Sequence, residues 1–190
     1  MTRRGILFVI SGPSGVGKGT IRNALLPRVD NLQVSISATT RKPRSNEVNA
    51  REYFFVSEDE FRELIAEDKL IEWACVYSNL YGTPRDFVMK SLEKGLDVLL
   101  EIDIQGAMQV KEKMPEGVFI FIAPPSIDEL IERLCNRGQD SQESIEARFA
   151  ASQKEMSYMK EYDYVVVNDN LADAVKKTES IIIAERCKIN

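Results

Sequence analysis

A glycine-rich segment between an apolar run and a helix-forming run constrains the fold of this chain more than any other feature. The segment reads GPSGVGKGT at residues 12–20 and lies between the apolar residues 6–10 and the sequence IRNALL at 21–26. Its first three glycines allow backbone conformations that other residues avoid, so several N–H groups can point at one anion. The helix that follows adds its positive end, and Lys18 adds an ammonium group. Strand, loop, lysine and helix in this order predict a site that cradles phosphates.

The residue after the lysine departs from the strict form of this pattern, which has Ser or Thr there to bind Mg²⁺. This chain has Gly19 at that position, and the hydroxyl follows one residue later on Thr20. The departure leaves the phosphate site intact and leaves open whether the protein supplies a direct metal ligand. A plain turn between strand and helix is the alternative, and the lysine and the flanking segments disfavour it.

Composition excludes several classes of protein. The 190 residues suit one domain or one core with insertions, and no apolar run approaches the ~20 residues of a membrane span. The net charge of −5 disfavours a nucleic-acid binder, and the absence of histidine removes the commonest general base. Three scattered cysteines match no metal-ligand spacing, and the N-terminus lacks a signal-peptide layout. We therefore expect free thiols, no zinc site and a cytoplasmic protein.

The order of apolar runs predicts a doubly wound α/β core. Four short runs rich in β-branched or aromatic residues read as buried parallel strands, at residues 6–10, 98–104, 118–122 and 164–167. Helical segments separate them, two of which begin with capping boxes at 57–60 and 126–129. A last helix places Leu171, Ala174, Val175, Thr178, Ile181 and Ile182 on one face. This alternation is typical of a parallel sheet covered by helices.

Two stretches interrupt the alternation. Residues 33–83 mix short strands at 34–37 and 53–56 with a helix at 58–68, which predicts an α+β insertion. Residues 136–148 are polar and charged between two helices, which predicts a small lid. The core then comprises residues 1–32, 84–135 and 149–190.

The insertion carries a second set of charged residues. Arg41, Lys42 and Arg44 place three cations in four residues, and two nearby guanidinium groups bind a phosphate through paired hydrogen bonds. A solvated basic loop is the alternative. Glu72 lies between large apolar residues, where a buried carboxylate needs a partner. It would suit guanine, which presents two N–H donors side by side, although an ordinary strand-edge acid is the alternative. Two hydroxyls follow in the YGT sequence at residues 81–83.

Throughout its length the chain resembles the guanylate kinase family. The resemblance rests on nine segments in the family's order and spacing: GPSGVGKGT at 12–20, SATTRKPR at 37–44, EYFFV at 52–56, IEW at 71–73, YGT at 81–83, EIDIQGA at 101–107, FIAPPS at 121–126, RLCNRG at 133–138 and VVVND at 165–169. It implies a P-loop NTPase-type core with a GMP-binding insertion and a lid. It also implies transfer of the γ-phosphoryl group of ATP to GMP with Mg²⁺. ATP and GMP are then the expected partners, without nucleic acid, membrane or an obligate protein partner.

The resemblance assigns roles to residues by position. Those implied to bind GMP are Ser37, Arg41, Arg44, Tyr53, Glu72, Tyr81, Thr83 and Asp103. Those implied to bind ATP are Gly12, Ser14, Gly15, Val16, Gly17, Lys18, Gly19, Thr20, Arg133 and Asn168. The implied catalytic set is Lys18, Arg41, Asp103, Arg137 and Arg148. Thr20 and Asp103 would reach Mg²⁺ through water.

Two of these roles have plainer alternatives, and the chain as a whole has two competing functions. Asp103 would otherwise cap the following helix, and Arg148 would be a solvated surface arginine. Another nucleoside monophosphate kinase is one competing function, because Gly19-Thr20 is also similar to adenylate kinase loops. A non-catalytic guanylate-kinase-like interaction module is the other, and the intact Lys18 disfavours it.

Overall fold

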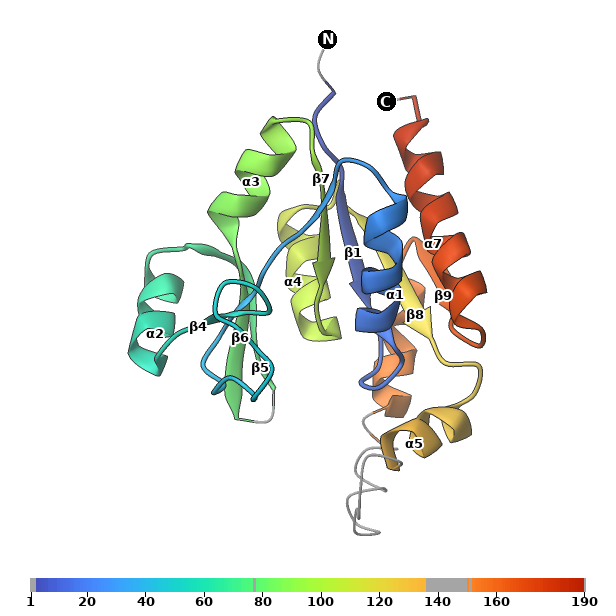
Figure 1. Ribbon diagram of the computed structural model, residues 1–190, viewed down its shortest axis with the longest axis horizontal. Coiled ribbons are helices and arrows are strands. Elements are labelled where there is room, and N and C mark those ends of the chain that lie inside the picture. The colour runs from blue at the N-terminus through green and yellow to red at the C-terminus, as the bar shows by residue number, and fades with distance from the viewer. Residues whose placement is uncertain (1–2, 77, 136–149, 151, 190) are drawn as a thin grey trace. The chain divides into compact units, whose positions relative to one another are not determined.

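A five-stranded sheet with the strand order β2-β7-β1-β8-β9 forms the core of the protein. We describe it from a computed structural model that covers residues 3–76, 78–135, 150 and 152–189 (Figure 1). The strands are β1 (Leu7–Ser11), β2 (Leu32–Val34), β7 (Asp97–Glu101), β8 (Val118–Ala123) and β9 (Tyr164–Val167). The pairs β1–β8, β8–β9 and β2–β7 are all parallel. The chain divides into two compact units, which are described separately below.

The second unit, Phe8–Asp30, Glu101–Ile104 and Val118–Asn190, holds the most buried strands. All five residues of β1 and all six of β8 are buried, as expected for parallel strands covered on both faces. The helices of this unit are α1 (Lys18–Leu25), α5 (Ile127–Cys135) and α7 (Leu171–Arg186), with 3₁₀ turns at Leu26–Arg28 and Tyr158–Glu161. Residues 152–157 are also helical. In Figure 1, α7 runs beside α1, with which it is in contact.

The first unit, Met1–Leu7, Asn31–Leu100 and Gln105–Gly117, contains a smaller sheet of order β4-β3-β6-β5. Its strands are β3 (Ala38–Thr39), β4 (Phe54–Phe55), β5 (Leu70–Val76) and β6 (Asn79–Pro84). The helices are α2 (Glu58–Ala66), α3 (Arg85–Glu93) and α4 (Ile104–Lys113), whose first residue belongs to the second unit. Ala38, Phe61 and Leu70 form a buried apolar cluster under this sheet. The mixed strands and helices of this unit position the second set of charged residues.

The structure confirms the predicted fold class and corrects four details. The segment expected as a strand at 34–37 is instead β2, Leu32–Val34, which pairs with β7 in the parallel sheet. Strand β7 ends at Glu101 rather than at 104, so Asp103 lies between β7 and α4. Helix α2 ends at Ala66 rather than at 68. Leu171, placed by periodicity on the buried face of α7, is 40% exposed because it is the first residue of the helix.

No helix among the described residues is long and apolar enough to cross a membrane. The predicted lid at 136–148 lies outside the described residues. The predicted core and insertion boundaries stay predictions.

Candidate functional site: a phosphate loop and an anion-binding sheet

The glycine loop of the second unit has the backbone that an anion cradle needs. Gly12 has a φ of 144°, and a Cβ atom there would lie 2.2 Å from the carbonyl oxygen of Ile122, so only glycine fits beside β8. Helix α1 begins directly after the loop and has no acidic residue in its first turn. Its unpaired N–H groups and the positive end of its dipole therefore remain available to a negative ligand.

Lys18 lies across the mouth of this loop. Its Nζ donates hydrogen bonds to the carbonyl oxygens of Gly12 (2.6 Å) and Pro13 (3.0 Å). Burial lowers the pKa of Lys18, while the carboxylates of Glu101, Glu155 and Asp103 act in the opposite direction. Three acidic groups therefore offset the cost of keeping a desolvated ammonium charged. Glu155, in the helical stretch 152–157, was not singled out from the sequence, and burial raises its pKa.

Asn168 clamps the loop from β9. Its Nδ2 donates to the carbonyl oxygen of Val16 (2.8 Å), and its backbone N–H donates to Ala123 (2.8 Å). Gly17 has a φ of 95°, and a Cβ atom there would lie 2.6 Å from Asn168 Nδ2. The clamp therefore requires a glycine at position 17. The contact of Asn168 with ATP stays a prediction, and its support of the loop is a structural role that the sequence did not reveal.

Glu101 approaches the loop from the end of β7. Its carboxylate pairs with Arg22 of α1 (2.7 Å), and a Cβ atom on Gly19 would lie 3.2 Å from Glu101 Oε1. The missing side chain at position 19 thus leaves room for this carboxylate. Glu101 Oε2, the atom that pairs with Arg22, is buried, and carboxylate oxygens are ligands that suit Mg²⁺.

The described residues contain no group of three or more His, Cys, Asp or Glu side chains that could hold a metal ion. Mg²⁺ commonly keeps several waters and binds through one or two carboxylates and the phosphates of a nucleotide. Glu101, Asp103 and the exposed residue Thr20 carry oxygen ligands of the kind that such a partial site uses.

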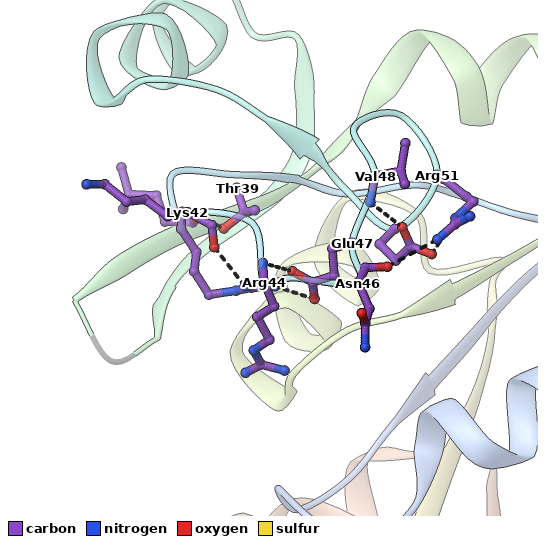
Figure 2. A network of polar contacts seen from close by, with 10 residues as sticks. Thr39, Lys42, Arg44, Asn46, Glu47, Val48 and Arg51 are labelled. Atoms are coloured by element: carbon purple, nitrogen blue, oxygen red, sulfur yellow. Dashed lines mark hydrogen bonds and ion pairs between the residues drawn. The ribbon is translucent and has the colours of Figure 1, made fainter.

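In the first unit, the Arg41 side chain is held by the carboxylate of Glu47. Arg41 Nη2 donates to Glu47 Oε1 (2.8 Å), and Arg41 Nη1 donates to the carbonyl oxygen of Lys42 (2.9 Å). Glu47 also accepts from the backbone N–H of Arg44 (2.8 Å) and returns its own N–H to Arg44 O (3.0 Å). Figure 2 shows this network, in which the exposed Arg44 side chain points away from the Glu47 carboxylate. Glu47 therefore closes the loop between the two arginines, a role the sequence did not reveal.

Aromatic rings surround the Arg41 guanidinium. It lies 5.4 Å from the ring centre of Tyr53 and 5.8 Å from that of Phe55. The Tyr53 and Tyr81 rings meet edge to face with centres 5.9 Å apart. The hydrogen bond from Arg41 is the main reason that the pKa of Glu47 falls below its usual value. Arg41 is only 16% exposed, so its charge is held in one place, as a phosphate ligand would require.

Glu72 and Thr83 meet on adjacent strands of the same sheet. Glu72 on β5 is 3% exposed, and Thr83 on β6 has no exposed surface. The Thr83 hydroxyl donates to Glu72 Oε1 at 2.6 Å, which supplies the partner that a buried carboxylate needs. Ser37 lies immediately before β3, and β3 pairs with β6, the strand that carries Thr83. The remaining predicted residues are Arg133, whose position in α5 is described without its side chain, and Arg137 and Arg148, which lie outside the described residues.

A parallel sheet with a glycine loop, a lysine and a helix at the end of its first strand defines a phosphate-loop protein. Comparisons with known proteins agree. The sequence model of the family described as guanylate kinase matches residues 4–185. A guanylate kinase of Syntrophomonas wolfei is 64% identical over 189 residues, covering 100% of this chain and 97% of the relative. One from Caldanaerobacter subterraneus is 56% identical, covering 99% and 91%.

The crystal structure of guanylate kinase from Anaplasma phagocytophilum is similar in fold, with a TM-score of 0.82 and 35% identity, covering 98% of this chain and 89% of that one. A shikimate kinase from Bacteroides thetaiotaomicron shares the fold alone, with a TM-score of 0.52 and 13% identity over 94% of this chain and 98% of its own. The chain belongs to the guanylate kinase family.

Proposed function

We propose that this protein transfers the γ-phosphoryl group of ATP to GMP, forming ADP and GDP. Membership of the guanylate kinase family supports this activity, and the buried Glu72 carboxylate is the structural observation that carries the choice of base. An ionised carboxylate only accepts hydrogen bonds, so it pairs with the N1 and N2 donors of guanine. Adenine presents no such pair of donors. Thr83 and Ser37 complete the proposed base site.

The GMP phosphate is assigned to the cations and hydroxyls around Arg41. Arg41 and Arg44 bind it, with Tyr53 and Tyr81 beside them, and Glu47 holds the loop that carries both arginines. The paired N–H groups of a guanidinium match the oxygens of a phosphate. Two anionic substrates repel each other, and these arginines offset that repulsion.

ATP is assigned to the glycine loop, including Ser14, Gly15, Val16, Gly19 and Thr20. The loop N–H groups and the N-terminus of α1 bind its phosphates, and Lys18 exchanges its contacts with Gly12 and Pro13 for phosphate oxygens. When bound with ATP, Mg²⁺ supplies positive charge to the phosphate oxygens, and Glu101, Asp103 and Thr20 are the residues that fit its surroundings.

Catalysis of phosphoryl transfer consists mainly of aligning the two substrates and stabilising the negative charge on the phosphoryl group that moves. The GMP phosphate oxygen is already nucleophilic, so no general base is needed in a chain without histidine. Lys18, Arg133, Arg137 and Arg148 are the proposed groups that stabilise charge on the phosphoryl group in transit. The cytoplasm, where both nucleotides occur, is the proposed location.

The test is coupled ADP production from ATP with GMP, AMP, CMP and UMP in parallel. We expect rapid turnover only when GMP is the acceptor. An equal or faster rate with AMP would overturn the choice of base, and no turnover with any acceptor would overturn the kinase proposal.

A further inference from the structure

Strand β5 carries an irregularity at the residue that we assign to the guanine base. On β5 the pairing moves from Leu70 to Trp73 while on β6 it moves from Pro84 to Gly82, so β5 has one extra residue. Ile71 and Glu72 therefore both oppose Thr83, which is the arrangement of a β-bulge. A bulge re-aims a side chain, and here the Glu72 carboxylate meets the Thr83 hydroxyl at 2.6 Å.

The bulge lies on an edge strand, because β5 is the last strand in the order β4-β3-β6-β5. Within the described part of the chain, one side of its backbone therefore has no neighbouring strand. A bulge also interrupts the ladder with β6, so strand pairing alone does not hold Ile71 and Glu72 in place. A Cβ atom on Gly82, opposite Trp73, would lie 3.0 Å from Glu72 O, so the strands approach closely here.

Side chains of α4 bind the open side of β5 on both sides of Glu72. Gln109 makes two hydrogen bonds to Trp73, accepting from its N–H (3.2 Å) and donating to its carbonyl oxygen (2.7 Å). Lys113 Nζ donates to the carbonyl oxygen of Ile71 at 2.6 Å. The amide of Gln109 thus pairs with Trp73 as a strand residue would, and Lys113 holds the other residue that flanks Glu72.

We propose that Gln109 and Lys113 are positioning residues for base recognition, which fix the bulge in β5 and thereby aim Glu72 at guanine. Neither residue contacts the carboxylate in any described interaction, and each acts through the backbone of a neighbour of Glu72. The proposal rests on the proposed function, because it takes Glu72 to be the group that reads the base. A structural alternative is that α4 merely covers an exposed strand edge, as proteins commonly do.

The two explanations predict different changes in base discrimination. IMP lacks the exocyclic N2 amine of GMP, so the ratio of kcat/KM for GMP to that for IMP measures the contact made by the carboxylate. A cover for the strand edge would alter stability and leave this ratio unchanged. A positioning role alters the ratio, because a displaced carboxylate loses its hydrogen bond to N2.

The experiment compares the full-length wild type with Gln109→Leu, Lys113→Met and Lys113→Arg. Glu112→Gln, on an exposed side chain of α4 between the two, is the matched control, and Glu72→Gln tests the base site itself. We expect Gln109→Leu and Lys113→Met each to lower the GMP-to-IMP ratio about three- to ten-fold, the worth of one hydrogen bond. The KM for ATP should change less than two-fold. Lys113→Arg, which still donates to Ile71, should restore the ratio.

Two results separate failure of this inference from failure of the proposed function. If Glu72→Gln lowers the ratio while Gln109→Leu and Lys113→Met leave it at the wild-type value, the positioning role is wrong and the base site stands. If Glu72→Gln itself leaves the ratio unchanged, the assignment of guanine to Glu72 fails and this inference fails with it. Loss of the fold in both α4 variants would also count against positioning, because the contacts would then hold the whole unit together.

Discussion

Lys18 is the residue whose charge most directly serves the proposed reaction. Burial lowers the pKa of Lys18, and the carboxylates of Glu101, Glu155 and Asp103 act in the opposite direction. We expect Lys18→Ala to lower kcat by roughly 10²–10³, the usual effect of removing a donor that stabilises transition-state charge. Steady-state rates and circular dichroism measure activity and fold together. Lys176→Ala, an exposed lysine on α7, is the control, and a folded Lys18→Ala protein with near-normal turnover would refute the role.

A substitution at Glu72 should change the affinity for GMP but not that for ATP when each nucleotide is titrated alone. Glu72→Gln replaces a group that only accepts hydrogen bonds with one that also donates, so it mismatches guanine. We expect GMP binding to weaken by about 1.5–3 kcal/mol, the worth of a hydrogen bond to a charged group, with ATP binding unchanged. Calorimetric titration measures both. Equal weakening of the two nucleotides would show that Glu72 supports the fold instead.

Glu47 offers a test of charge placement that needs no substrate. The hydrogen bond from Arg41 is the main cause of the lowered pKa of Glu47. Arg41→Met should therefore raise the pKa of the Glu47 carboxyl group, and NMR titration measures this change. Since the folded state favours the ionised form, this pair stabilises the protein above the ordinary glutamate pKa of about 4.3. That contribution is lost as the pH falls through the lowered value. Arg51→Met, which removes the partner of Glu52, is the control and should leave Glu47 unchanged. An unchanged pKa in Arg41→Met would contradict the network in Figure 2.

At the scale of elements, local signals were the easiest to predict. The capping box at the start of α2 is fully formed, with the Ser57 hydroxyl accepting from the Glu60 N–H and the Glu60 carboxylate accepting from the Ser57 N–H. Both partners lie within four residues, so the sequence contains the whole interaction. The buried runs that became β1 and β8 were predicted for a similar reason, because parallel strands covered on both faces are continuously apolar. The run at 164–167 is also a strand, β9, but the expectation that it is buried is wrong, because it lies at the edge of the sheet with Val165 and Val167 exposed.

Elements that depend on distant partners were missed or misplaced. Strand β2 has three residues at the edge of the sheet, and only its pairing with β7 identifies it. Apolar residues at Ile102 and Ile104 extended β7 too far, since burial in a turn looks the same in a sequence as burial in a strand. The bulge at Glu72 depends on the register of β6 and on contacts with α4, and α4 lies more than 30 residues further along the chain. The clamp from Asn168 to Val16 spans a still larger separation.

The α2 cap allows a quantitative test at this scale. Ser57→Ala removes the acceptor for the Glu60 N–H, which should cost about 1 kcal/mol of unfolding free energy. Urea denaturation measures the change, and Ser45→Ala, in the exposed loop before β4, should be neutral by comparison. A loss no larger than that of Ser45→Ala would mean that the cap does not stabilise α2.

At the scale of the whole molecule, the proposed ligands are divided between the two compact units. The residues assigned to the GMP base and phosphate belong to the first unit, apart from Asp103, and the glycine loop and Lys18 belong to the second. Transfer requires both nucleotides in one arrangement, yet each must enter and leave. We therefore expect the insertion at residues 33–83 to move on a stable parallel sheet when both nucleotides, or an analogue joining them, are bound.

Fluorescent labels on Cys75 of β5 and on a cysteine replacing Glu132 of α5 report this motion, with Cys135 and Cys187 changed to serine. The energy-transfer efficiency should rise on saturation with the joined analogue, and less so with GMP alone. The same protein carrying Lys18→Ala is a control for loss of the ATP half. Unchanged efficiency with the analogue bound would refute closure while leaving the kinase activity intact.

In the proposed reaction the γ-phosphoryl group of ATP passes to GMP. A single-turnover reaction with ATP labelled at the γ-phosphate, quenched and separated by chromatography, follows that group itself. We predict that the label appears in the β-phosphate of GDP, in amounts equal to the ADP formed, with none released as inorganic phosphate. Label in inorganic phosphate whether or not GMP is present, or label that stays in ATP, would contradict the account.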